Sequence, residues 1–153
     1  MSIFGVGPSL AVVGGMTFLL VFVLQRIVGL SMRADAACLT GLRIAGFCWG
    51  ATGLWFWVGS AILVARSHRR HKLATEGVYR CSRNPMYAAF IVFLIPAISF
   101  ISGDLLILSV SVVMFVAFKA LIRKEETYLK REFGEEYEHY AKRVAQLIPF
   151  INV

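Results

Sequence analysis

Two polar segments of this chain carry the side chains that are suited to chemistry. The first polar segment, residues 71–87, combines tyrosines and arginines with an Asn-Pro pair, and the second polar segment, residues 125–140, combines paired glutamates with tyrosines and basic residues. Between them, residues 88–124 are almost uncharged until Lys119, which is long enough to enter a membrane, turn and come back. The two segments are therefore predicted to meet on one side of a membrane, where such groups favour chemistry on a molecule that resides in the bilayer.

The first polar segment contains a signal for the start of a helix. The residue before a proline is pushed out of the helical region and proline suits the first turn, so a helix is predicted to begin at Pro85. Its free amide groups and the positive end of its dipole suit an anion such as a carboxylate. Tyr79, Arg83, Asn84 and Tyr87 surround this helix start. An aromatic belt with a snorkelling arginine would explain the same residues without a catalytic role.

The second polar segment begins with two adjacent carboxylates, Glu125 and Glu126. Neighbouring positions on a helix point about 100° apart, so the two side chains are not expected to share one salt bridge. One is expected to face the interior of the helix bundle, and the other the basic loop of the first polar segment. An inward glutamate near that segment is placed to hold a cation.

The elements that position these groups are predicted to be membrane-spanning helices. The 153 residues are 58% hydrophobic and 16% charged, against about 45–50% and about 25% in soluble domains, which predicts a single integral membrane domain over residues 1–153. The expected fold is all-α, with about four transmembrane helices, a tight C-terminal helical hairpin and a cytoplasmic amphipathic C-terminal helix over residues 130–144. The predicted spans are residues 3–24, 44–65, about 86–101 and 104–121.

Two features inside the spans constrain how the helices pack. Pro96 cannot donate a backbone hydrogen bond, so a neighbouring helix is expected to cover the carbonyl that it leaves unpaired. Gly46 and Gly50, with Gly53 further along, give the second span a face of small residues. Packing within the chain is favoured over a dimer interface at this face, and a monomer is expected.

Charge and cysteine usage argue against several other functions. The net charge of +7 comes from basic residues beside apolar spans, which favours anionic membrane lipids over nucleic acid as the partner. Cys38, Cys48 and Cys81 are too scattered for a disulfide framework or a metal site and are expected to be free thiols. His68 and His71 have a spacing seen among zinc ligands, but no second pair of ligands follows, so no metal site is predicted.

The distribution of Lys and Arg predicts the orientation in the membrane. The turn at residues 99–104 has none, whereas the loop at residues 66–85 and the segment after residue 118 are rich in them. Both polar segments are therefore expected in the cytoplasm. The arginines that fall on the opposite side, against this rule, are Arg26, Arg33 and Arg43.

The two polar segments resemble the isoprenylcysteine carboxyl methyltransferases and their relatives among the membrane phospholipid methyltransferases. The family pattern is roughly H-x-L-V-T-x-G-x-Y-x-x-x-R-H/N-P-x-Y, a helical hairpin, and then E-E-x-x-L-x-x-x-F-G-x-x-Y-x-x-Y-x-x-x-V-x-x-x-I-P-F. Asn84 replaces the histidine that often precedes the proline, and Ala145 replaces a proline that often follows the valine. The matching residues are His71, Leu73, Thr75, Gly77, Tyr79, Arg83, Asn84, Pro85, Tyr87, Glu125, Glu126, Leu129, Phe133, Gly134, Tyr137, Tyr140, Val144, Ile148, Pro149 and Phe150.

The resemblance implies transfer of a methyl group from S-adenosylmethionine, leaving S-adenosylhomocysteine, to a lipophilic acceptor reached from the bilayer. It implies a methyltransferase core over residues 71–153 and variable helices over residues 1–70 on the lipid and substrate side. The chain has no G-x-G-x-x-G loop, so the motif residues must bind the cofactor. The cofactor-binding residues that the resemblance implies are Tyr79, Asn84, Pro85, Tyr87, Glu125 and Glu126.

The chemistry of the acceptor decides which side chains would act on it. A carboxylate is already ionised at neutral pH, so it needs orientation by an arginine, with Arg83 as the first candidate, rather than a base. An amine, as in a phosphatidylethanolamine N-methyltransferase, needs a base, and Glu126 or a neighbouring tyrosine is then the candidate. The catalytic candidates are Arg83, Glu126, Arg123 and Arg143, and the expected substrate contacts are Arg83, Tyr137 and Tyr140.

Two alternatives without methyl transfer remain open at this point. A membrane scaffold with a degenerate motif predicts no cofactor binding. A small exporter requires an acidic residue inside a span, and the first two predicted spans have none.

Overall fold

The computed structural model describes residues 6–30, 32–70 and 73–149, and within them it has helices and no strand, as the all-α prediction requires. The elements are α1 (Gly7–Ile27), α2 (Ala36–Arg70), the 3₁₀ turn η1 (Gly77–Arg80), α3 (Pro85–Ala88), the π-helical segment η2 (Ala89–Leu94), α4 (Ile95–Ser102), the 3₁₀ turn η3 (Leu105–Ile107) and α5 (Leu108–Arg143). α3, η2 and α4 follow one another without a break. This continuous rod begins at Pro85, which confirms the helix start that the Asn-Pro pair predicts.

The predicted membrane spans are present, with longer helices than expected. At 1.5 Å per residue the 35 residues of α2 extend over about 52 Å, which exceeds the ~30 Å hydrocarbon core of a bilayer. Part of this helix must therefore lie outside the core of the membrane. The protein is an integral membrane protein, and the four stretches of the described chain that are long and apolar enough to cross are Gly7–Ile27, Ala36–Ser67, Pro85–Ser102 and Leu105–Arg143.

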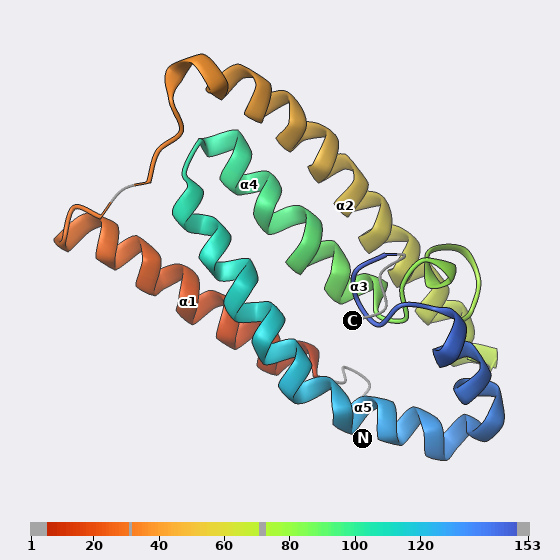
Figure 1. Cartoon of the computed structure of the whole chain (residues 1–153). Helices are drawn as coiled ribbons and strands as arrows, with labels where there is room; N and C mark the ends of the chain where they lie inside the picture. The colour runs from red at the N-terminus through yellow and green to blue at the C-terminus, as the bar shows by residue number, and fades with distance from the viewer. Residues whose placement is uncertain (1–5, 31, 71–72, 150–153) are drawn as a thin grey trace.

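The fourth span and the C-terminal helix were predicted as two separate helices, whereas the structure has one helix, α5, over both. Residues 105–133 contain neither Gly nor Pro, so α5 continues through its charged part without interruption. The backbone departs from helical geometry only at Gly134, with φ 54° and ψ −128°, in the left-handed region that glycine tolerates. After this kink the last turns of α5 change direction and lead back toward the first polar segment (Figure 1). The location of these turns at a membrane surface stays a prediction.

The predicted hairpin is confirmed, with a tight turn between α4 and η3. Gly103 ends α4 with a positive φ of 70°, and the Asp104 carboxylate accepts a hydrogen bond from the Leu106 amide at 3.1 Å. The segment between α1 and α2 lies against this turn, because the Ala34 amide donates to the Gly103 carbonyl at 2.9 Å. One end of the bundle is therefore formed by the α1–α2 connection and the hairpin turn (Figure 1).

A carbonyl in the turn before Pro96 is covered by a neighbouring helix, the kind of contact that the proline predicts. Val92 lies four residues before Pro96, and its carbonyl accepts a hydrogen bond from the Trp49 indole nitrogen of α2 at 2.7 Å. The small-residue face of α2 packs within the chain, since a Cβ at Gly53 would lie 2.8 Å from the Cβ of Phe93. A Cβ at Gly46 would lie 2.8 Å from Ile101 of α4. The predicted intramolecular role of this face is confirmed.

The α3–η2–α4 rod and α5 lie between the other two long helices (Figure 1). α1 packs on α5, and α2 packs on η2 and α4. A buried apolar core joins α1, the rod and α5 around Phe118 and Ile122, which are 0% and 1% exposed. A second core joins α2, η1 and η2 around Phe56 and Phe93. Both cores reach the end of the bundle opposite the hairpin turn, where the two polar segments lie.

Candidate active site

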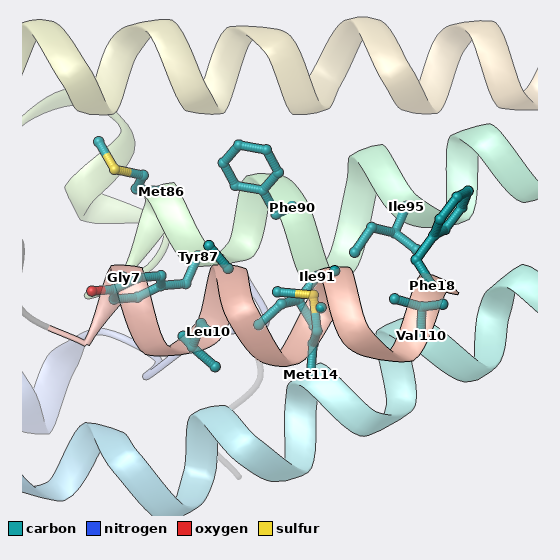
Figure 2. A pocket seen from close by; sticks show the side chains of 13 residues that line it. Gly7, Leu10, Phe18, Met86, Tyr87, Phe90, Ile91, Ile95, Val110 and Met114 are labelled. Atoms are coloured by element: carbon teal, nitrogen blue, oxygen red, sulfur yellow. The ribbon is translucent and has the colours of Figure 1, made fainter. Parts of the chain in front are cut away.

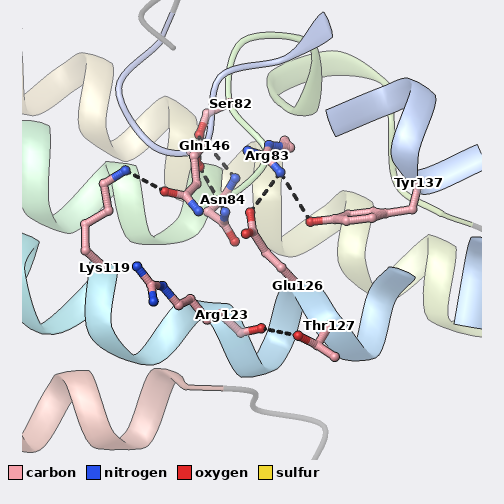
Figure 3. A network of polar contacts seen from close by, with 9 residues as sticks. All are labelled: Ser82, Arg83, Asn84, Lys119, Arg123, Glu126, Thr127, Tyr137 and Gln146. Atoms are coloured by element: carbon pink, nitrogen blue, oxygen red, sulfur yellow. Dashed lines mark hydrogen bonds and ion pairs between the residues drawn. The ribbon is translucent and has the colours of Figure 1, made fainter. Parts of the chain in front are cut away.

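The two polar segments meet through Arg83 and Glu126, as the sequence predicts. Nη1 of Arg83 lies 2.8 Å from Oε1 of Glu126, and the two side chains are only 15% and 23% exposed. The same Nη1 donates to the Tyr137 hydroxyl at 3.4 Å, which the kink at Gly134 brings back over the site (Figure 3). One arginine of the first segment thus contacts two parts of the second.

Two buried polar atoms at this meeting point lack a hydrogen-bond partner within residues 6–30, 32–70 and 73–149. Nε of Arg83 and Oε1 of Glu126 are buried and have no hydrogen-bond partner among the described residues. The short Nη1–Oε1 distance is therefore an ion pair whose geometry does not make a hydrogen bond. Buried polar atoms without partners are costly, typically about 1–3 kcal/mol each.

Glu125 points to a different set of partners from its neighbour Glu126. Its Oε2 accepts one hydrogen bond from the Tyr87 hydroxyl and one from the Val6 amide, both at 3.2 Å. The carboxylate therefore joins the N-terminal end of α1 to the α3–η2–α4 rod. The expectation that the adjacent glutamates do not share one salt bridge is confirmed.

Asn84 ties the first polar segment to the chain that follows α5. Its Nδ2 donates to the Gln146 carbonyl at 2.9 Å, and its backbone amide donates to the Ser82 hydroxyl at 3.2 Å. The Arg83 amide donates to the Ala145 carbonyl at 2.8 Å. Asn84 is 9% exposed and Pro85 is almost fully buried. The predicted binding of an anion at this helix start stays a prediction.

Tyr79 lies on the α2 side of the site. Its hydroxyl is 3.2 Å from the hydroxyl of Ser60, and its carbonyl accepts a hydrogen bond from the Tyr140 hydroxyl at 2.7 Å. Burial raises the pKa of Tyr79 above its ordinary value of 10.0; the hydrogen bond with Ser60 opposes this shift, and the negative charge of Glu125 adds a lesser increase. The Tyr79 hydroxyl therefore stays protonated, and able to donate, at neutral pH.

Two of the predicted catalytic candidates lie apart from the ion pair. Arg123 is exposed on α5 one turn before Glu126 (Figure 3). Arg143 is exposed at the end of α5, where its Nε donates to the His139 carbonyl at 3.2 Å. Arg83 is therefore the candidate that the fold places at the meeting point. Of the family pattern, His71 and Phe150 lie outside the described residues.

Three residues of this network were not predicted from the sequence. The Gln146 carbonyl accepts from Asn84, and its side-chain Oε1 accepts from Lys119 at 2.8 Å (Figure 3). Ser82 is fully buried and bridges Asn84 to Gln146, to whose carbonyl its hydroxyl donates at 3.5 Å. A backbone acceptor such as the Gln146 carbonyl leaves no signal in the sequence. Ser60 of α2 did leave a signal in the sequence, because a polar side chain inside a membrane span needs a hydrogen-bond partner.

Comparison with known proteins was consistent with the motifs. A model of the phospholipid methyltransferase family matches residues 34–136. The protein-S-isoprenylcysteine O-methyltransferase B of Arabidopsis thaliana is 35% identical over 91 residues, which cover 60% of this chain and 46% of that protein. The protein-S-isoprenylcysteine O-methyltransferase of Schizosaccharomyces pombe is 33% identical over 92 residues, which cover 60% of this chain and 39% of that protein.

A human relative extends this pattern at the same level of similarity. The protein-S-isoprenylcysteine O-methyltransferase of Homo sapiens is 33% identical over 82 residues, which cover 54% of this chain and 29% of that protein. The matched regions therefore span less than half the length of each of these relatives. No solved structure matches the chain significantly. The family match covers well over half of the residues, and the chain belongs to the phospholipid methyltransferase family.

Proposed function

We propose that the protein is a membrane methyltransferase that uses S-adenosylmethionine to methylate the carboxylate of a lipophilic acceptor at the cytoplasmic face, as an isoprenylcysteine carboxyl methyltransferase does. The observation that carries the proposal is the Arg83–Glu126 ion pair, which joins both motifs at a place largely shielded from water, with side-chain exposures of 15% and 23%. The named relatives support the same class of reaction.

The cofactor-binding role is assigned to the residues around this pair. S-adenosylmethionine, when bound, supplies a methyl group on a positively charged sulfur. A carboxylate held against that charge would stabilise the ground state more than the transition state, so Glu125 and Glu126 are assigned to the amino and ribose groups. Tyr79 and Tyr87 provide hydroxyl groups on either side, and Asn84 and Pro85 fix the backbone between them.

The acceptor role is assigned to Arg83 with two tyrosines. A carboxylate acceptor needs no base, and a guanidinium that holds one of its oxygens leaves the other free to attack. Nε of Arg83 is buried and has no hydrogen-bond partner among the described residues. Tyr137 and Tyr140 are 5% and 6% exposed and keep water away from this side of the site.

A phospholipid amine is the second candidate acceptor. It is favoured by the description of the family model, phospholipid methyltransferase. An amine loses a proton on methylation, and the carboxylate of Glu126 at the meeting point is a suitable acceptor for that proton. Membrane lipids are then substrates as well as surroundings.

The test is a transfer assay with radioactive methyl groups in detergent or liposomes. We expect label on a prenylated cysteine with a free carboxylate, and none on the same compound with the carboxylate esterified. Label on phosphatidylethanolamine instead would select the second candidate.

Cofactor binding is measured separately by calorimetry. We expect a dissociation constant in the micromolar range for S-adenosylmethionine or S-adenosylhomocysteine, which corresponds to a binding free energy of about −8 kcal/mol. Asn84→Ala is expected to lose this binding. The absence of heat with both compounds would reject the enzyme in favour of a scaffold or exporter.

A further inference from the structure

The chain that follows α5, residues 144–149, has no regular helix and lies against the candidate active site; we call it the strap. Ala145 and Leu147 are buried, at 5% and 2% exposure, and Leu147 belongs to the core that joins α1, the rod and α5. The carbonyls of Ala145 and Gln146 accept hydrogen bonds from the first polar segment. Irregular backbone in a membrane protein needs partners within the protein, so these contacts decide where the strap lies.

Gln146 joins the strap to two different parts of the molecule. Its backbone carbonyl accepts a hydrogen bond from Nδ2 of Asn84 at 2.9 Å and one from the Ser82 hydroxyl at 3.5 Å. Its side-chain Oε1 accepts a hydrogen bond from Nζ of Lys119, on α5, at 2.8 Å (Figure 3). A displacement of Gln146 at the Lys119 end would therefore move the acceptor that Asn84 uses.

The bond to Gln146 fixes how the Asn84 amide is oriented. An asparagine amide has a donor end and an acceptor end, and the hydrogen-bond network assigns them. Because Nδ2 donates to the strap, Oδ1 is the end that can accept a hydrogen bond from a ligand. Asn84 is 9% exposed, so water offers few alternative partners to its donor end. The orientation of Asn84 thus depends on the Gln146 carbonyl staying in place.

Lys119 makes a strong attachment for the strap because its charge lies at the border of the apolar part of α5. Residues 105–118 carry no charged side chain, and Phe118 is fully buried. Lys119 is itself partly buried, with Nζ 5.9 Å from the centre of the Phe115 ring. A hydrogen bond from a charged donor is roughly twice as strong as one between neutral groups, and a scarcity of water strengthens it further.

We propose that Lys119 is a positioning residue that acts through Gln146 to hold the Asn84 side chain at the candidate active site. The inference rests on the proposed function, in which Asn84 belongs to the cofactor-binding residues, and it adds a residue of α5 that lies outside the family pattern. It requires no contact between Lys119 and the cofactor. Removal of the lysine side chain should weaken cofactor binding and leave the KM for the acceptor, measured at saturating cofactor, unchanged.

The direct test is calorimetry with S-adenosylhomocysteine on the unmodified protein, Lys119→Met, Gln146→Leu and the double variant. The two substitutions remove the charged donor and the side-chain acceptor, while the Gln146 backbone carbonyl stays. We expect each single variant to raise the dissociation constant about tenfold, and the double variant to raise it no further. Any other contact of Lys119 would contribute an additive loss. Fully additive losses, or an unchanged dissociation constant in Lys119→Met, would overturn the proposal.

Two further variants separate this role from a general effect of charge. Lys119→Arg keeps a cationic donor on a long side chain and is expected to recover most of the affinity that Lys119→Met loses. Lys142→Met removes an exposed lysine near the end of α5 and is the matched control, which should bind S-adenosylhomocysteine as the unmodified protein does. Equal losses in Lys119→Arg and Lys119→Met, or in Lys142→Met and Lys119→Met, would contradict the proposal.

Hydrogen–deuterium exchange without cofactor tests the same link independently of the proposed function. The Arg83 amide donates to the Ala145 carbonyl at 2.8 Å, so release of the strap opens this amide to exchange. Exchange in peptides that contain Arg83 should be faster in Lys119→Met than in Lys142→Met, and Gln146→Leu should show the same increase if Lys119→Met does not fold. Unchanged exchange would reject the link. Faster exchange in a protein that binds no cofactor would keep the link and reject the proposed function.

Discussion

Arg83 connects three elements through different parts of one residue. Its backbone amide holds the chain after α5 at Ala145, its Nη1 contacts Glu126 and Tyr137, and its Nε has no partner among the described residues. A guanidinium fixed on one edge and free on another is suited to orient a carboxylate. Lysine offers no comparable planar arrangement of donors.

Arg83→Ala is therefore expected to reduce kcat about a hundredfold while leaving the affinity for S-adenosylhomocysteine unchanged. The carboxylate acceptor would lose its orienting group, whereas the residues assigned to the cofactor remain. Single-turnover kinetics and calorimetry measure the two effects separately. Arg131→Ala, which removes an exposed arginine from the same helix α5, is the control and should change neither. An equal loss of binding and turnover in Arg83→Ala would remove its assigned role.

At the scale of the elements, the α3–η2–α4 rod departs from regular α-helical geometry in the turn before Pro96. Pro96 removes one donor, and the turn before it is π-helical, a feature often found at functional sites. The Trp49 indole donates to the Val92 carbonyl in an apolar setting. This one hydrogen bond also fixes the position of α2 against the rod.

Trp49→Phe is expected to lower the free energy of unfolding by about 0.6 to 1.7 kcal/mol, the range measured for hydrogen bonds between membrane helices. Pro96→Ala restores an amide donor at residue 96, so the same substitution should cost less in this background if the Trp49 bond compensates for the proline. Reversible unfolding in mixed micelles measures all four members of this double-mutant cycle. Equal costs in both backgrounds would show that the bond does not compensate for Pro96.

The elements show what the sequence could and could not predict. Apolar length located all four spans, and the Asn-Pro pair located the start of the third at Pro85. The π-helical segment could not be predicted, because residues 89–94 are apolar on every side and carry no periodic signal. The change in charge near Lys119 suggested a boundary between two helices, but backbone geometry changes only at Gly134. For the site, the meeting of Arg83 with Glu126 followed from the length of the hairpin, whereas the contacts of Gln146 did not.

At the scale of the whole molecule, the polar site and the hairpin turn lie at opposite ends (Figure 1). Cys38 is exposed near the start of α2, at the end that carries the hairpin turn. Glu76 is exposed just before η1, at the end that carries the site. These two positions therefore report the orientation of the chain in a membrane.

In intact cells a membrane-impermeant maleimide is expected to label Cys38 in a variant with Cys48→Ser and Cys81→Ser. A variant with all three native cysteines changed to serine and with Glu76→Cys should react only after the cells are permeabilised, because the Lys and Arg distribution places that end in the cytoplasm. The reverse pattern of labelling would invert the proposed orientation.

The hydrogen bond between Val6 and Glu125 has a consequence for how two ligands influence each other. The carboxylate that we assign to the cofactor also holds the N-terminal end of α1. Gly7, Leu10 and Gly14 of α1 line an apolar pocket of about 420 Å³ (Figure 2). Two binding events that draw on a shared group are energetically coupled, and the coupling is reciprocal. The cofactor should therefore alter the affinity for a ligand of this pocket by the same factor by which that ligand alters the affinity for the cofactor. A helix end that a cofactor-binding carboxylate contacts makes cooperativity between a water-soluble and a membrane-bound ligand an expected property of this fold.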